Sequence, residues 1–311
     1  MATRDLVIGV LFLSQTTFGI WGNCSLCYHY IFCYFTGCRV RSTGLILRHL
    51  TVANSLVITF KGVPQTMEAF GLKIFLNDFG CKLVLYVLRV GRGVSLGTTC
   101  LLSVVQAFTI SPRNSRWAEL KVQVLKCTGP CIILCWILYM LVNIIFPLYV
   151  TSKWKNKTIT KEKDLGYCYG MWTNKSTQSL LAAVLTAPDV VCLGLMLWAS
   201  ISMVFTLYRH KQRVQYIHRN NISPRSSPET RAMQSTLVLV STFISFYTLS
   251  SIFSVCLALS DHPSWWLLNI TAMFALCFPS VSPCLLIHEP RGLRLFSACC
   301  RRNTHFPKLF R

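Results

Sequence analysis

Seven long apolar runs divide this 311-residue sequence, and they constrain its fold more than any other feature. About 20 predominantly apolar residues are needed for an α-helix to cross the hydrocarbon core of a bilayer. The runs therefore predict transmembrane helices at about residues 6–35, 45–70, 81–108, 127–149, 180–208, 233–259 and 265–287. The expected fold is an all-α membrane protein. A seven-helix bundle spans residues 1–288, and a basic cytoplasmic tail spans residues 289–311.

The charge content agrees with burial in lipid. Only 13% of the residues are charged, whereas soluble domains carry about 25%. The net charge of +21 would first suggest a nucleic-acid partner, but the basic residues are divided among short segments between apolar runs and form no continuous groove. We therefore expect the lipid bilayer as a partner, and no nucleic acid.

Lysine and arginine residues gather in alternate loops, and cytoplasmic loops are the ones enriched in these residues. The basic segments predicted to be cytoplasmic are residues 39–48, 113–126, 209–231 and 291–311. The loop at residues 151–178 also holds lysines, partly offset by Glu162 and Asp164. The asymmetry predicts an extracellular amino terminus, and an odd number of spans then places the tail inside the cell.

Sites of covalent modification follow from this orientation. Asn156 and Asn174 begin Asn-x-Ser/Thr sequons in the loop predicted to be extracellular, where glycosylation occurs. Cys299 and Cys300 lie beside Arg301 in the basic tail, as palmitoylated cysteines often do. Two unmodified cysteines are an equal alternative there.

The positions of the cysteines suggest a single disulfide. Cys81 opens the third apolar run and Cys168 lies in the large outer loop. In an oxidising compartment this pair is expected to form a bridge, and two free thiols are the alternative. Cys127, Cys131 and Cys135 recur every four residues on one helix face. No histidine or acidic residue completes a metal site there, so we expect packing and no metal.

Charged residues inside the predicted spans indicate a candidate ligand site. A charge at mid-bilayer costs a few kcal/mol, so it usually faces a cavity or a partner. Arg89 and Arg92 share a face of the third helix with Tyr86, while Glu68 lies on the second helix and Asp189 on the fifth. We expect these residues to border one outward-facing polar cavity that binds a ligand. The alternative is internal ion pairing that only fixes the helix register.

Enzyme signatures are missing from the sequence: it has no His-Glu-x-x-His, no Gly-x-Ser-x-Gly and no phosphate loop. We therefore expect neither an enzyme nor a cofactor. Gly93 and Gly97 are spaced for close helix packing in lipid. A small transporter or channel remains the alternative function, although no internal repeat is evident. That alternative predicts a polar path that reaches both faces of the membrane.

Several segments of the sequence resemble the vomeronasal type-1 receptor family, over about residues 6–286. The segments are HLTVANS (49–55), KGVPQTM (61–67), GCKLV (80–84), RVGRGVS (89–95), TTCLLSV (98–104), ISPRNSRW (110–117), NIIFP (143–147), DLGYC (164–168) and RHKQRVQ (209–215). Cys81, Cys168 and Asn156 match family positions. The resemblance thus supports the disulfide and the glycosylation.

The resemblance implies a G protein-coupled pheromone receptor of the plasma membrane with a rhodopsin-like architecture. Such a receptor binds a small semiochemical and activates a heterotrimeric G protein of the inhibitory type. The basic residues expected at the G-protein contact are Arg113, Arg116, Arg209, Lys211 and Arg213. A receptor-like remnant without signalling is a further alternative.

The chain departs from the broader rhodopsin-like receptors at three places. The inner end of the third helix has no Asp-Arg-Tyr, and the seventh helix has Ser282-Pro283-Cys284 instead of Asn-Pro-x-x-Tyr. The second helix offers Asn54 and no aspartate in its inner half. The activation mechanism of rhodopsin-like receptors therefore does not transfer directly to this chain.

Overall fold

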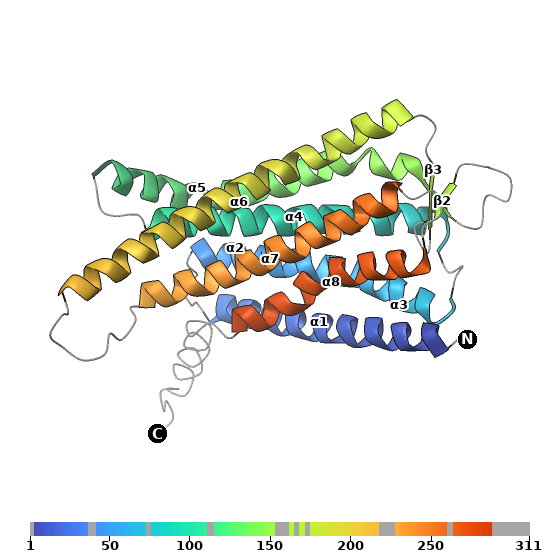
Figure 1. Cartoon of the computed structure of the whole chain (residues 1–311), viewed down its shortest axis with the longest axis horizontal. Helices are drawn as coiled ribbons and strands as arrows, with labels where there is room; N and C mark the ends of the chain where they lie inside the picture. Colours follow the sequence, from blue (N-terminus) through green and yellow to red (C-terminus); the bar gives the residue numbers. More distant parts are fainter. Residues whose placement is uncertain are drawn as a thin grey trace, which may run out of the picture.

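The computed structural model describes residues 3–36, 42–72, 76–110, 115–152, 162–164, 168–171, 175–217, 228–259 and 264–287. Within these residues, seven long helical segments run side by side along the molecule (Figure 1). They are α1 (Thr3–Phe35), α2 (Ser42–Val57) continued by η1 (Ile58–Gly62) and α3 (Val63–Ala69), α4 (Asp78–Ile110), α5 (Ser115–Asn143), α6 (Lys175–Ile217), α7 (Pro228–Leu259) and α8 (Trp265–Ile287). The predicted seven-helix bundle is confirmed.

Six of these segments, in the described part of the chain, are long and apolar enough to cross a bilayer. Their outer faces expose large apolar side chains, such as Trp21 at 73% and Ile201 at 69%. Water would disfavour such a surface, whereas lipid covers it. The seventh segment, α4, packs against α2, α5, α6 and α7. Because α4 meets protein on most sides, it carries charges that a lipid-facing helix would not tolerate. The protein is a multi-pass membrane protein.

Several helices extend past the apolar runs. α5 begins at Ser115, ahead of the apolar run that starts at residue 127, and α6 continues to Ile217, past the run that ends at residue 208. Polar helix ends leave the hydrocarbon core, so hydropathy does not mark them. α5 ends at Asn143, and a 3-10 segment, η2 (Phe146–Tyr149), follows around Pro147, which cannot continue the α-helical hydrogen bonding.

The outer end of the bundle holds a small antiparallel sheet that the sequence did not predict. Its strands β1 (Val150–Ser152), β2 (Glu162–Asp164) and β3 (Cys168–Met171) lie in the order β1-β3-β2. A disulfide joins Cys168 in β3 to Cys81 in α4, with 5.9 Å between the Cα atoms. The bridge ties the loop to the top of the central helix. The start of α1 lies at this same end (Figure 1), in agreement with an extracellular amino terminus.

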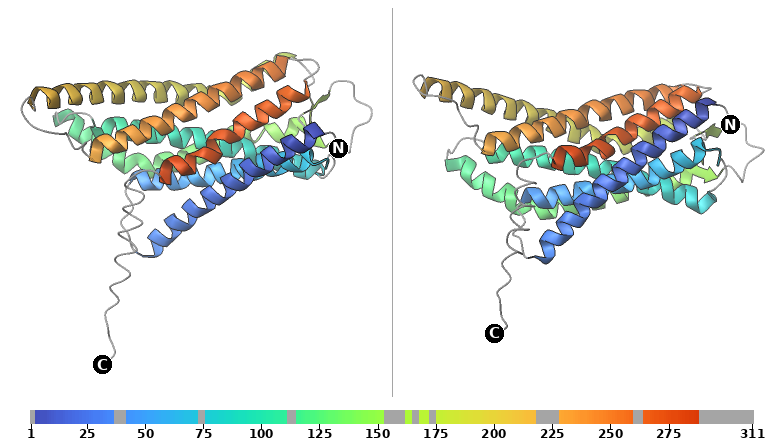
Figure 2. Two further views of the ribbon diagram at one scale, coloured as in Figure 1. Left: turned by 60° about the horizontal axis from the view of Figure 1, so that its bottom comes forward. Right: turned by 90° about the horizontal axis from the view of Figure 1, so that it is seen from below.

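At the opposite, inner end most helices pack around an apolar cluster, but α1 does not follow them. A continuous apolar cluster fills this half, including Leu96, Leu102 and Val105 of α4 with Leu239 of α7 and Leu286 of α8. α1 crosses the bundle obliquely, and its inner end diverges from the other helices (Figure 2). Exposure of Phe35 at that end agrees with this divergence. The inner half of the described bundle is therefore mainly an apolar core.

The second membrane-spanning segment contains a π-helical turn, η1, between α2 and α3. Pro64 stands directly after this turn and has no N–H to donate to the preceding turn of the helix. The wider turn places Lys61 within electrostatic range of Glu68 and of Arg92 on α4. Such π turns are frequent at functional sites, and here the turn brings a cation toward the central helix.

Candidate functional site

A carboxylate on α6 organises a group of polar side chains between the helices. Asp189 accepts hydrogen bonds from two tyrosines, at Oδ1 from Tyr139 of α5 (3.1 Å) and at Oδ2 from Tyr247 of α7 (2.5 Å). Hydrogen bonds to an ionised group are stronger than neutral ones. One aspartate thus ties α5 and α7 to α6.

Two arginines of α4 complete this group. Arg89 donates from Nε to Oδ1 of Asn143 on α5 (2.9 Å), and it lies within electrostatic range of Arg92 and Asp189. The Arg92 guanidinium lies over the Tyr247 ring, with Cζ 4.8 Å from the ring centroid. We call the group formed by Arg89, Arg92, Tyr139, Asn143, Asp189 and Tyr247 the charged centre.

A glycine of α4 makes room for the charged centre. A Cβ at Gly93 would overlap the Tyr139 ring, and a Cβ at Gly97 would overlap Sγ of Cys135. Only hydrogen at these positions lets α5 approach closely, as the glycine spacing predicts. Tyr139, 2% exposed, thereby passes across the face of α4 and reaches Asp189.

A small cavity of about 30 Å³ adjoins the charged centre on the side of α7 and α8. Arg92 and Ser95 of α4 and Ser250 of α7 supply polar groups to its lining. The remaining walls are mainly aromatic, from Phe243, Phe246, Tyr247, Phe274 and Phe278. Such a combination of apolar walls and a few polar groups is typical of small-molecule sites.

A second buried polar group lies one helical turn further inward along α4. Asn54 of α2 donates to Ser282 of α8 (2.8 Å) and accepts from Ser95 of α4 (2.7 Å). Ser282 in turn donates to the Pro279 carbonyl (3.4 Å), which has lost its usual helical donor because residue 283 is proline. We call Asn54, Ser95 and Ser282 the neutral centre.

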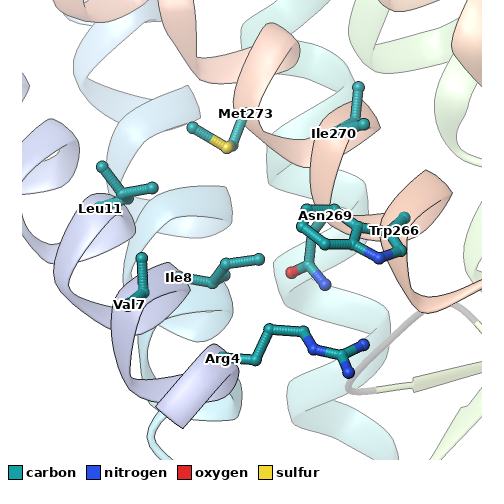
Figure 3. A pocket seen from close by; sticks show the side chains of 8 residues that line it. All are labelled: Arg4, Val7, Ile8, Leu11, Trp266, Asn269, Ile270 and Met273. Atoms are coloured by element: carbon teal, nitrogen blue, oxygen red, sulfur yellow. The ribbon is translucent and has the colours of Figure 1, made fainter.

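A larger cavity of about 350 Å³ opens between the outer ends of α1 and α8 (Figure 3). Its walls are mainly apolar, and Val7, Leu11 and Trp266 among them are exposed on the lipid-facing surface. Its polar groups have other contacts, since Arg4 lies over the Trp265 ring and the Asn269 amide donates to the Trp265 carbonyl. The lining of this cavity is therefore mainly an apolar, lipid-facing surface.

Comparison with known proteins decides the family. The model of the vomeronasal organ pheromone receptor family matches residues 6–298. The chain is 58% identical to human vomeronasal type-1 receptor 4, over 92% of this chain and 95% of the relative. It is 55% identical to human vomeronasal type-1 receptor 3 over the whole of both chains. A more distant relative is the zebrafish olfactory receptor class A-like protein 1, 29% identical over 94% of this chain and 92% of the relative.

The chain belongs to the vomeronasal type-1 receptor family. The resemblance found in the sequence motifs is thereby confirmed. The family is one of chemosensory receptors that resemble G protein-coupled receptors, and its members are receptors rather than enzymes. The expectation that this chain is no enzyme agrees with its membership of the vomeronasal type-1 receptor family.

The five residues predicted to bind ligand in this vomeronasal receptor chain are only partly brought together. Arg89, Arg92 and Asp189 meet in the charged centre. Tyr86 turns toward α5, where its hydroxyl donates to the Met140 carbonyl (3.2 Å). Glu68 lies on α3, accepts a hydrogen bond from Gln65 (3.2 Å) and lies within electrostatic range of Lys61. The ligand-binding role of all five stays a prediction.

The other predicted sites of this vomeronasal receptor chain lie at its ends and loops. Asn156, Asn174, Arg113, Cys299 and Cys300 fall outside the described residues. Arg116 belongs to the first turns of α5, and Lys211 and Arg213 belong to the last turns of α6. Arg209 also lies on α6, with its guanidinium over the Phe205 ring at 5.7 Å. Part of the predicted G-protein contact is therefore helical rather than loop.

The sequence prediction for this vomeronasal receptor chain missed four polar residues of the site. It considered charged residues in the spans, and so passed over Tyr139, Asn143, Tyr247 and Ser250. A usable signal was present in α5, where Tyr139 and Asn143 are four residues apart and so share one face of the otherwise apolar last turns of the helix. No comparable spacing signal distinguishes Ser250 from the other serines of α7.

Proposed function

We propose that the chain is a plasma-membrane pheromone receptor that binds a small semiochemical beside the charged centre and activates a heterotrimeric G protein of the inhibitory type. The observation that carries this proposal is the placement of Arg89, Arg92 and Asp189. Three charges gather toward the outer side of the membrane core, in a family of chemosensory receptors. Charged residues at such depth are usually functional.

Contacts of Tyr247 suggest how ligand binding would reach the inner end. Tyr247 on α7 contacts both Asp189 on α6 and Arg92 on α4. A ligand that engages Arg92 competes with this contact and changes the relative free energy of two helix arrangements. Only such differential affinity drives a conformational change. The inner end of α6, which extends beyond the other helices (Figure 1), would then separate from the inner end of α7 and admit the G protein.

The transporter or channel alternative receives less support. It needs a polar path through the whole membrane, but the inner half of the described bundle is closed by apolar residues. The cluster there includes Leu102 and Val105 of α4, Ile132 of α5 and Leu239 of α7. A one-sided polar site fits a receptor that binds from outside and signals without transporting its ligand.

A cell-based assay tests the proposal. The receptor is expressed with a promiscuous G protein, a panel of volatile compounds is screened, and active compounds are then tested for lowering of stimulated cyclic AMP. Blockade by pertussis toxin identifies coupling to an inhibitory G protein. Ligand flux into the same cells, without a second-messenger change, would favour a transporter.

Replacing Arg89 with Met tests the site. The response should be lost, because the charge and the hydrogen bond to Asn143 are removed. The variant should be less stable than the parent but should still reach the cell surface in normal amounts. Arg4→Met is the matched control, since Arg4 is an outer-end cation beside Trp265 and away from the charged centre. Loss of surface expression in Arg89→Met would indicate a purely structural role instead.

A further inference from the structure

Arg92 has an unusual electrostatic environment. Its contact with the Tyr247 ring is a cation–π interaction, and no hydrogen bond or salt bridge joins its guanidinium to any residue that the structure describes. Asp189 is the acidic residue of the charged centre, and it already accepts hydrogen bonds from two tyrosine hydroxyls. Lys61 and Arg89 add like charge nearby. An arginine within a membrane core normally pairs with an acceptor, so Arg92 has unused capacity for one.

A second unsatisfied polar group lies in the same cavity. Ser250 lines the cavity from α7 and is 2% exposed, and its hydroxyl has no hydrogen-bond partner among the residues that the structure describes. A buried hydroxyl without a partner is rare in native proteins and calls for an explanation. Arg92 and Ser250 thus present donors to one small space from two different helices.

The walls of this space define what else a ligand must carry. Phe243 and Phe278 meet edge to face at 4.5 Å between ring centroids, and Phe246 and Phe274 lie 6.5 Å apart. A volume of about 30 Å³ exceeds the ~10–15 Å³ that one water needs, and it admits one small polar group. A ligand body attached to that group must therefore part the phenylalanine rings that form the walls, and these rings favour contact with a hydrocarbon or an aromatic ring.

From these contacts we propose that Arg92 and Ser250 form an oxyanion subsite in the small cavity beside the charged centre. It would take the carboxylate or sulfonate-type group of a small acidic semiochemical whose apolar body packs against the phenylalanines. The inference rests on the proposed function and narrows its ligand class. Guanidinium and carboxylate or sulfonate oxygens form strong, charge-assisted hydrogen bonds.

Binding to purified receptor tests this subsite without any G protein. The full chain in nanodiscs of zwitterionic lipid is titrated with four probes that share a phenyl ring: phenylacetate, phenylmethanesulfonate, 2-phenylethanol and 2-phenylethylamine. At equal concentration, a ligand that binds only the folded state raises the unfolding temperature more when it binds more tightly. Both anions should raise this temperature more than the alcohol does, and the amine should not raise it. The two anions also distinguish a carboxylate preference from a sulfonate preference.

Variants assign the effect to the subsite. Arg92→Gln should weaken binding of the anions by roughly 10- to 100-fold, as expected for loss of a charge-assisted hydrogen bond. Arg92→Lys keeps the charge and should retain part of the affinity. Ser250→Ala should weaken binding by roughly 3- to 10-fold. Ser254→Ala is the matched control, because that hydroxyl donates to the Ser250 carbonyl and not to the cavity.

Several outcomes would overturn the subsite. They are equal stabilisation by the alcohol and the anions, an equal effect from chloride alone, or unchanged anion affinity in both Arg92→Gln and Ser250→Ala. If Arg92→Gln fails to fold, the anion affinities of Arg92→Lys and Ser250→Ala still test the subsite. Anion binding without cyclic AMP signalling would reject the proposed function and keep the subsite, whereas signalling by neutral compounds without anion binding would do the reverse.

Discussion

Two buried polar groups lie one turn apart along α4, and they differ in how completely they are paired. In the neutral centre, Asn54, Ser95 and Ser282 satisfy one another across α2, α4 and α8. In the charged centre, Asp189 accepts from two tyrosine hydroxyls, while the Arg92 guanidinium lies over the face of the Tyr247 ring and has no hydrogen bond to any described residue. The same central helix therefore carries one closed network and one open network.

This difference distinguishes polar residues that stabilise the fold from polar residues that are available to a ligand. A buried network with every member bonded rigidifies the helices it joins, and removal of one member leaves the others unpaired. A buried charge without a polar partner lowers the stability of the fold when no ligand is bound, and an acceptor on a bound ligand would raise it. The neutral centre is expected to hold the bundle together, and the charged centre is expected to respond to a ligand.

Breaking the neutral centre should have the largest effect on stability. Asn54→Leu leaves the Ser95 hydroxyl without its acceptor and the Ser282 hydroxyl without its donor, with an expected loss of about 2–4 kcal/mol in the free energy of unfolding. Thermal unfolding of the purified receptor and surface labelling in cells measure it. Asn54→Asp, which still accepts hydrogen bonds, should lose less. An unchanged unfolding temperature in Asn54→Leu would show that the network contributes nothing.

Crowding the charged centre should lower the stability of the receptor less than breaking the neutral centre does. Gly93→Ala places a methyl group against the Tyr139 ring and moves its hydroxyl away from Asp189, with an expected cost of about 1–3 kcal/mol, as for other overpacked cores. Gly129→Ala is the matched control in α5, because no atom lies within 4 Å of its added Cβ. That control should be neutral or slightly stabilising. Equal behaviour of the two variants would mean that α5 shifts freely.

Much of the fold was predictable, because lipid imposes a simple rule on the sequence. Each membrane-spanning helix needs an apolar run, and the seven runs gave seven helices. Even α4, which carries charges and is missing from the six most apolar segments, was predicted as one of the seven apolar runs, at residues 81–108. The helix ends at Ser115 and Ile217 were not predicted, since polar turns outside the hydrocarbon core carry no hydropathy signal.

The site was predictable only in part. Charges inside spans are rare, so Arg89, Arg92 and Asp189 could be singled out from the sequence alone. Their partners could not, because the sequence does not state how each helix is rotated about its axis. Tyr86 was expected beside Arg89 on the cavity side, yet its hydroxyl turns to α5. Tyr247 joined the site through the contact of α7 with α4, which no local pattern encodes.

The smallest effect on stability is expected for the residue with the largest expected role in binding. Arg92→Gln removes a charge that has no polar partner among the described residues, so the free energy of unfolding should stay within about 1 kcal/mol of the parent or rise above it. Arg89→Gln is the sharper comparison, because it breaks the bond to Asn143 and should lower the unfolding temperature. If Arg92→Gln destabilised the receptor as much as Arg89→Gln, Arg92 would be a structural member of the charged centre. The distinction between an open and a closed network along α4 would then fail, because both arginines would be holding helices together in the absence of ligand.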